Sequence, residues 1–422
     1  MVHLNEIRSG FEERGLLREA ARLYARAVLA GDTWAAILLV GCWDRAHPGD
    51  LCAARWVAES APVDDSGTAA SLLLALRRVG ADAEARELAG RVVAGVRLDD
   101  PSGVASLVTG LRELGEDELV RRLAERGSDL ASLDNPWSGV DPPAAIVEAQ
   151  RWFAEEHANS PPAGLDATTV RLDDPIAVSV VLHELREEGE LDQAHQLAVR
   201  ASPVVGVDNP YAVSQFVREA RAAGAGDAVA VLVSRDPAEQ IRLDRPYGLP
   251  DLLIELHEAG AHEQVTRLAR RITAGIQDDV LHQPGLVQSL LHGLWHAAQP
   301  KQVRLLAGRV VGRIQLSDQR AVAGILDTLV EADAQDEVAV LLSRDLGMRV
   351  TIGIDKQAAA LVLAALRKAG ANDQAEMYAQ RLPEAGQFLL FREQPGNEQL
   401  YRFGREADGT PAPAWDWDDV LQ

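Results

Sequence analysis

Apolar residues recur along this chain in blocks that have the spacing of one helix face, and short polar phrases separate the blocks. Ala70, Leu73 and Leu76 are one example, and Val104, Leu107, Val108 and Leu111 are another. Residues three or four apart share a face of a helix, so each block predicts an amphipathic helix. A second apolar block follows most of these after a glycine, which indicates two helices joined by a tight turn.

A phrase of the type Leu-Asp-Asp-Pro precedes each first block. An Asp or Asn before Pro is a helix start, because the side chain caps free N–H groups and Pro suits the first helical position. The phrase recurs at intervals of 35 to 39 residues, in clear copies and then in three degenerate ones. The copies begin at Val63, Leu98, Leu133, Leu172, Val207 and Leu243, and then at Leu281, Leu316 and Ile354.

Two further positions keep the same register. The turn glycine is found at Gly80, Gly115, Gly189, Gly224, Gly260 and Gly370. An arginine closes the second helix, where the helix dipole favours a cation. We expect these arginines to form a structural ladder with acidic residues of the next phrase, and a phosphate-binding row is the alternative that the acidic surroundings disfavour. The arginines are Arg91, Arg126, Arg200, Arg235, Arg271, Arg309, Arg344 and Arg381.

Stacked two-helix units of this length cover one another's apolar faces. The predicted fold is therefore all-α: a right-handed α-solenoid of ~35-residue repeats over 63–383, with a small C-terminal β-hairpin and tail. Residues 1–62 are predicted to be an atypical N-terminal start or cap. Its tryptophans, Trp34, Trp43 and Trp56, are expected to seal the end of the core rather than to form a binding platform.

One unit, 133–171, is irregular, since it contains five prolines and lacks both the turn glycine and the closing arginine. A helix is expected at 143–157, with Trp152 and Phe153 as possible partner-binding residues. We favour a structural kink over a ligand pocket for this unit, because Pro is the commonest helix interrupter.

The chain changes character over 384–422. Aromatic runs on either side of Pro-Gly-Asn predict a β-hairpin at 386–404. In the tail, tryptophans alternate with aspartates, and two interpretations stay open: a cap that folds back on the last repeat, which we favour, or a motif that docks in a partner's groove. The tail residues proposed for partner binding are Trp415, Asp416, Trp417 and Asp418.

Composition narrows the choice of partner. The chain has 422 residues and a formal net charge of −22, so nucleic-acid phosphates and anionic membranes are poor partners. Two cysteines, Cys42 and Cys52, are too few for a disulfide framework. There is no signal-peptide pattern and no apolar run of the ~20 residues that a membrane helix needs, so a cytoplasmic protein is expected.

Residues with catalytic or metal-binding potential form no motif. Phosphate-binding glycine loops and a Gly-x-Ser-x-Gly elbow are absent from the sequence. His292 and His296 lie four residues apart and could share a metal, but the adjacent glutamate of a zinc hydrolase is missing. We predict no catalytic, cofactor-binding or metal-binding residues.

The period and the helix pairs resemble those of tetratricopeptide-like repeat proteins. The phrases LDDP, LREAGA-like turns, LAxR ends and the terminal YRFGREADGTPAPAWDWDD look closest to uncharacterised repeat proteins of actinobacteria. The resemblance implies a groove for protein partners or peptides, and a scaffold or sensor part in a bacterial signalling or conflict system. The chain departs from the usual tetratricopeptide pattern, since Leu or Ala replaces the glycine expected within the first helix.

The sequence thus predicts a non-catalytic protein-interaction scaffold whose partner is an unidentified protein or peptide. The alternatives are an enzyme with an unrecognised site and, less favoured, an RNA-binding protein similar to pentatricopeptide repeats, which share the period but need a basic groove.

Overall fold

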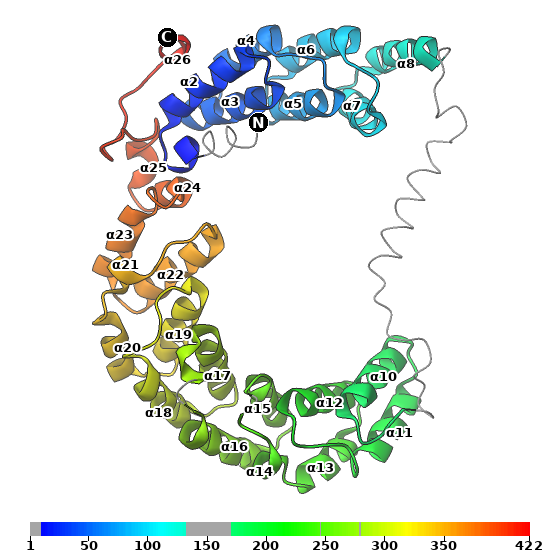
Figure 1. The fold of residues 1–422 in the computed structure, drawn as a ribbon, viewed down its shortest axis with the longest axis vertical. Coiled ribbons are helices and arrows are strands. Elements are labelled where there is room, and N and C mark those ends of the chain that lie inside the picture. Colours follow the sequence, from blue (N-terminus) through cyan, green and yellow to red (C-terminus); the bar gives the residue numbers. More distant parts are fainter. Residues whose placement is uncertain (1–9, 132–169, 245, 278–279) are drawn as a thin grey trace. The chain divides into compact units, whose positions relative to one another are not determined.

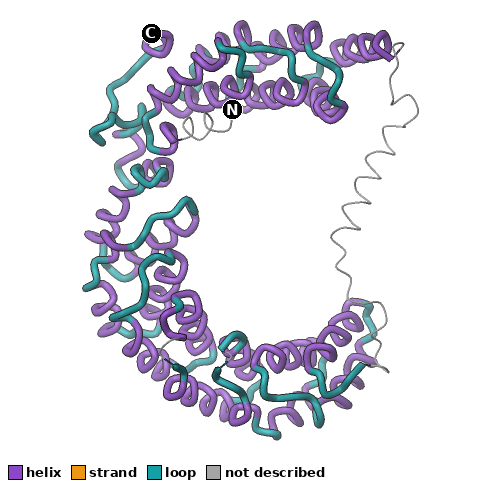
Figure 2. Tube along the Cα trace, in the orientation of Figure 1, coloured by secondary structure: helices purple, strands orange, loops and turns teal. Residues whose placement is uncertain are grey.

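A computed structural model describes residues 10–131, 170–244, 246–277 and 280–422 of the chain. These residues form two compact units (Figure 1). Unit 1 contains the described residues 10–131 and 382–422, and unit 2 contains those between 170 and 381. Every regular element in the described ranges is a helix (Figure 2). The irregular segment predicted within 133–171, with Trp152 and Phe153, lies outside these ranges except at its last two residues.

Helix pairs build both units. The first helices of the pairs are α3 (Thr33–Ala46), α5 (Ser66–Arg78) and α7 (Pro101–Glu113) in unit 1, and α10 (Pro175–Glu187), α12 (Pro210–Ala222), α15 (Leu249–Glu258), α17 (Pro284–His296), α19 (Gln319–Glu331) and α22 (Lys356–Lys368) in unit 2. Within each unit, consecutive first helices pack side by side.

The second helices pack behind the first ones. They are α4 (Cys52–Ser60), α6 (Asp82–Gly95), α8 (Asp117–Ala131), α11 (Leu191–Ala201), α13 (Gly226–Ser234), α16 (His262–Gly275), α18 (Pro300–Val310), α20 (Gln335–Leu342) and α23 (Asn372–Arg381). Two repeats of unit 2 add a short helix after a break in the second helix, namely α14 (Pro237–Gln240) and α21 (Leu346–Arg349). A short 3-10 helix, η1 (Val280–His282), precedes α17. The residue at each break, Asp236 or Asp345, has a left-handed backbone.

The polar phrases begin the first helices as predicted. The side chains of Asp65, Asp100 and Asp174 accept hydrogen bonds from backbone N–H groups in the first turn of α5, α7 and α10. Asn209 does the same for α12. Two phrases depart: α15 begins at Leu249, six residues after the start of its phrase, and Gln283 before α17 makes no side-chain capping hydrogen bond. Side-chain capping therefore fixes where most units begin.

The turn glycines have the left-handed backbone that ends a helix. Gly80, Gly115, Gly189, Gly224, Gly260 and Gly370 have φ between 72° and 81°. In two of the three degenerate repeats the same position holds Ala298, with φ 55°, and Asp333, with φ 50°. A side chain at this backbone conformation is strained, since the Cβ atom approaches the following carbonyl.

One apolar position of the second helix forms the centre of the core. Its residues are at most 3% exposed, and they are Leu88, Leu123, Leu197, Leu232, Leu268, Leu306, Leu341 and Tyr378. Tyr378 replaces leucine in the last unit, and Gln319 Nε2 donates to its hydroxyl at 2.5 Å. Burial raises the pKa of Tyr378 to about 12.

The β-hairpin predicted at 386–404 is wrong. The segment instead forms two short helices, α24 (Phe388–Arg392) and α25 (Asn397–Leu400). Phe388 and Phe391 are three residues apart and both are buried, which requires a helical turn rather than the alternation of a strand. The Pro-Gly turn remains, since Gly396 has a left-handed backbone and precedes α25.

The N-terminal and C-terminal segments belong to the same unit. The helix α2 (Leu17–Leu29) packs against α26 (Trp417–Leu421). The Nε atom of Arg22 donates to the carbonyl of Asp419 at 2.7 Å, and Arg18 pairs with Glu406 at 3.0 Å. Residues nearly 400 positions apart therefore share one core.

Candidate functional site

The closing arginines bridge neighbouring repeats through main-chain carbonyls. Arg309 donates to the carbonyls of Thr273 and Ile276 at 2.8 and 2.9 Å, and Arg344 donates to those of Val311 and Ile314 at 2.8 and 2.6 Å. The same two-carbonyl contact is made by Arg91, Arg126, Arg271 and Arg381. Arg235 donates to Ser202, and Arg200 also has an interaction partner.

These partners differ from the aspartates that we expected. The carbonyls lie three residues apart at the C-terminal end of the preceding helix, where a helix leaves acceptors unpaired and carries partial negative charge. That helix is the short α14 for Arg271 and the short α21 for Arg381. The planar guanidinium reaches both acceptors at once. We call this contact the arginine clamp. Burial, and then the nearby Arg349, lower the pKa of Arg344 in its clamp.

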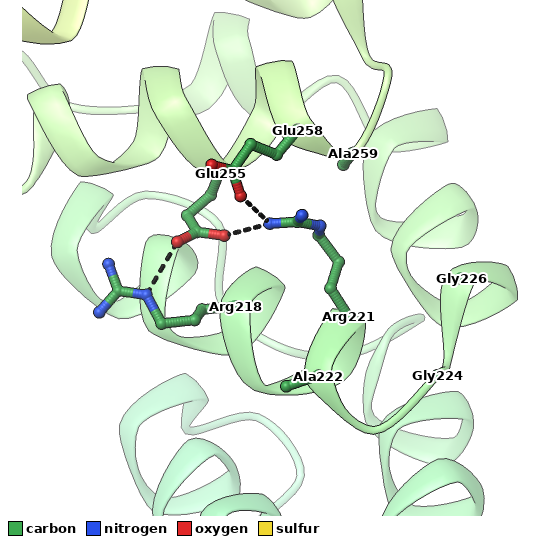
Figure 3. A pocket seen from close by; sticks show the side chains of 8 residues that line it. All are labelled: Arg218, Arg221, Ala222, Gly224, Gly226, Glu255, Glu258 and Ala259. Atoms are coloured by element: carbon green, nitrogen blue, oxygen red, sulfur yellow. Dashed lines mark hydrogen bonds and ion pairs between the residues drawn. The ribbon is translucent and has the colours of Figure 1, made fainter. Parts of the chain in front are cut away.

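The first-helix surface of unit 2 contains an open pocket of about 590 Å³ between α12 and α15 (Figure 3). Four charged side chains face one another there: Arg218 and Arg221 from α12, and Glu255 and Glu258 from α15. Small residues form the rest of the lining, including Gly224 and Gly226. The charges balance, so the pocket is polar without a net charge.

Glu255 is the centre of this cluster. It is only 5% exposed, and its carboxylate accepts hydrogen bonds from Arg218 Nε at 2.8 Å and Arg221 Nη1 at 2.7 Å. Arg221 Nη1 also reaches Glu258 at 2.7 Å. A buried carboxylate without partners would be strongly destabilising, so both arginines are held in place by Glu255.

Arg218 has donors left over. Only its Nε atom bonds within the described part of the chain, and Figure 3 shows its terminal nitrogens directed away from Glu255. The hydrogen bond to Glu255 raises the pKa of the Arg218 guanidinium. An oriented, charged guanidinium with open donors can bind an acceptor group on another molecule.

A row of exposed apolar side chains lies near the starts of the first helices. Ile176, Tyr211 and Tyr247 hold the same repeat position in three consecutive units and are 44%, 48% and 67% exposed. Gly248 lies against the backbone of Tyr211, and the Tyr247 hydroxyl donates to Gln283 Oε1 at 3.2 Å. The Tyr247 ring is therefore held at its hydroxyl end, and both tyrosine rings are largely open to solvent.

Ion pairs between adjacent first helices recur along both units, and our reading of the sequence missed them. Arg77 pairs with Glu113 at 2.8 Å, and Lys368 pairs with Asp327 and Glu331 at 2.5 and 2.9 Å. The signal was present, since a cation stands two or three residues before many of the turn positions. The acidic partner of each cation could have been found by comparing the same stretch of the neighbouring repeat.

The histidines of the sequence analysis lie on this surface as well. The rings of His292 and His296 are 4.1 Å apart, and burial followed by His296 lowers the pKa of His292. No group of three or more His, Cys, Asp or Glu residues in the described ranges could hold a metal ion. Among the same residues, no helix has both the length and the apolar character needed to cross a membrane.

The aromatic tail residues contact the N-terminal helices of unit 1. Trp415 is 3% exposed, its indole lies 5.3 Å from that of Trp43 in α3, and its Nε1 atom donates to the Phe403 carbonyl at 2.9 Å. Trp417 lies 5.1 Å from Trp43 and 5.6 Å from Trp56 in α4. Asp416 caps α26, and Asp418 is exposed.

The fold defines an all-helical tandem-repeat protein. No protein-family model matches the chain, and no curated protein matches it. One matching solved structure is described as "Circular tandem repeat protein with novel repeat topology and enhanced subunit contact surfaces". It is 11% identical, the match covers 95% of this chain and 76% of that one, and the TM-score is 0.15. A TM-score this low carries no argument, so the class rests on the repeat period and the helix pairs of this chain.

Proposed function

We propose that this protein is a non-catalytic scaffold that holds a protein or peptide partner on the first-helix surface of unit 2. The observation that carries the proposal is the exposed row of Ile176, Tyr211 and Tyr247, at one repeat position on the surface that also holds Arg218. Tyrosine and arginine are enriched among residues that dominate binding energy. A tyrosine has only two side-chain torsions, so it loses little conformational freedom when a partner binds.

The charge balance of this surface favours a protein partner over nucleic acid. The arginines of the pocket are already paired with Glu255 and Glu258, and the whole chain carries a net charge of −22. Nucleic-acid binding draws its affinity from unpaired cations that neutralise phosphates. A polar or acidic group of a protein can instead reach the open donors of Arg218 without the rest of the surface being basic.

Three finer features belong to the same proposal. The protein acts in the cytoplasm, its repeats turn in a right-handed solenoid, and it serves as a scaffold or sensor part of a bacterial signalling or conflict system. The resemblance to tetratricopeptide-like proteins of actinobacteria supports the last two. The free thiols of Cys42 and Cys52 support the first, since thiols stay reduced in the cytoplasm.

Comparative affinity capture tests the function. The tagged full-length protein and its Tyr211→Ala/Tyr247→Ala variant would be incubated with nuclease-treated native lysate, and the captured chains would be identified by mass spectrometry. Leu305→Ala is the matched control, because Leu305 is 52% exposed but lies on the second helix α18. Circular dichroism would verify that all three proteins fold alike.

We expect a stoichiometric protein that the wild type and the Leu305→Ala variant retain and the double-tyrosine variant loses. Loss of two hot-spot residues should weaken the affinity for the purified partner by roughly 30-fold or more. Arg218→Ala should weaken it too, whereas Arg270→Ala on α16 should not. Equal capture of the protein by all variants would refute the proposal. So would a parallel capture from lysate without nuclease that recovers RNA and no protein.

A further inference from the structure

A second pocket, of about 260 Å³, lies in unit 1 where the tail meets the N-terminal helices. We call it the tryptophan pocket. Indole and imidazole rings form its wall, from Trp43, His47, Trp415 and Trp417, and the rest of the lining includes Asp50, Asp416 and Asp418. The pocket therefore combines aromatic surfaces with carboxylates.

The rings are arranged at right angles. Trp415 makes an interplanar angle of 77° with Trp43, and Trp417 makes an angle of 85° with the same ring. His47 stacks on Trp43 with 4.1 Å between ring centroids. Trp43 and Trp415 are only 2% and 3% exposed, so the half-buried Trp417 is the indole that a ligand in the pocket reaches most readily.

The polar groups of the pocket are acceptors. Three aspartates line it, and none of its lining residues in the described chain is a lysine or an arginine. Burial would raise the pKa of Asp50, but hydrogen bonds from Cys52 outweigh it and the pKa is lowered, so this carboxylate is charged at neutral pH. The local field is therefore negative.

His47 adds a buried ring nitrogen that has no hydrogen-bond partner in the described part of the chain. Its Nε2 atom lies 2.7 Å from the Trp415 carbonyl, which can only accept, so Nε2 carries the proton in this contact. The Nδ1 atom is buried and has no hydrogen-bond partner within the described part of the chain. Buried polar atoms are rarely left unpaired, so this nitrogen, on a residue that lines the pocket, indicates a missing partner.

We propose that the tryptophan pocket binds an organic cation, either an alkylammonium or a guanidinium group. Cations are attracted to the faces of indole rings, and the aspartates supply a counter-charge. The volume suits a single head group. Such a ligand could be a small quaternary ammonium solute or the side chain of a modified lysine or an arginine in a partner protein, and both sources share the same chemistry.

Paired ligands of equal shape and different charge test this proposal on the full-length protein. Isothermal titration calorimetry would compare choline with its neutral isostere 3,3-dimethylbutan-1-ol, and N-acetylarginine amide with N-acetylcitrulline amide. We expect at least one cation to bind ten-fold or more tightly than its neutral partner. Choline alone would indicate a small solute, and the arginine amide alone would indicate a protein side chain.

Substitutions locate the binding. Trp417→Leu should weaken the binding of the cation at least ten-fold, and Asp418→Asn should weaken it without removing an aromatic wall. Trp34→Leu is the control for the first variant, because Trp34 is exposed outside the pocket, and Asp82→Asn on α6 is the control for the second. Neutral isosteres that bind as well as the cations, no binding of either cation, or variants that bind like the wild type would each overturn the proposal.

Discussion

The turn between the two helices of a repeat offers opposite predictions in two adjacent units. Gly260 ends α15 with φ 74°, and Ala298 ends α17 with φ 55°. Both positions are exposed, and a Cβ atom added at Gly260 would meet no heavy atom within 4 Å. Backbone conformation is thus the main term that changes when the two residues are exchanged, because neither side chain has packing to lose.

The magnitude follows from two opposing contributions. An L-residue in the left-handed region costs roughly 1–2 kcal/mol. Glycine in place of alanine costs about 0.4–1 kcal/mol, because the unfolded chain gains freedom. The difference is about 1 kcal/mol, so Ala298→Gly should raise the free energy of unfolding by about that amount and Gly260→Ala should lower it equally.

Urea unfolding followed by circular dichroism would measure both changes, and hydrogen exchange of peptides from 249–310 would show where they act. The double variant Gly260→Ala/Ala298→Gly should lie near the wild type, since the two terms cancel. A destabilised Ala298→Gly variant would refute the reasoning, because it would show that the alanine side chain contributes more than its backbone strain costs.

Three further predictions concern the clamps, the thiols and the helix caps. Arg344→Met should destabilise the protein by roughly 2–3 kcal/mol, because both carbonyls lose their donor. Arg344→Lys should cost about half of that, because an ammonium cannot reach both carbonyls. Urea unfolding of the two variants would measure which is less stable. Cys42 is 0% exposed and burial raises the pKa of its thiol, whereas Cys52 is partly exposed. A chromogenic disulfide should therefore titrate one thiol, Cys52, in the native protein and two in denaturant. The hydrogen bond from Thr68 lowers the pKa of Asp65 on folding. The contribution of Asp65 to the free energy of unfolding is therefore complete above about pH 4 and is lost as the pH falls further. Asp65→Asn should reduce this acid dependence of the unfolding midpoint.

Local signals in the sequence predicted the helices well because they act through neighbouring residues. A capping aspartate contacts N–H groups two or three positions away, and a turn glycine needs only its own backbone. The hairpin prediction was wrong because we followed the weaker of two local signals. Pro-Gly indicated a turn, but the spacing of Phe388 and Phe391 carried the stronger, helical signal.

Partners across repeats were harder to predict. The arginine clamp was visible as a periodic arginine, but its acceptors are carbonyl groups, which every residue has, so the sequence could not identify them. The burial of Glu255 and the meeting of Trp417 with Trp56 depend on how distant segments pack. The alternation of tryptophan and aspartate marked the tail as a cap or a docking motif, but it did not identify Trp43 and His47 as its neighbours.

The repeat separates the residues that hold the stack from those that face solvent on the first helices. The clamp arginine and the buried apolar residue beside it keep their type from unit to unit. The position thirteen residues before the turn residue, by contrast, differs from repeat to repeat. In unit 2 it holds Ile176, Tyr211, Tyr247, Gly285, Arg320 and Gln357. Since the clamps use main-chain carbonyls, a change at the position of Ile176 removes no clamp contact. Each unit can therefore present different chemistry to one extended partner, which is what recognition along a row of repeats requires.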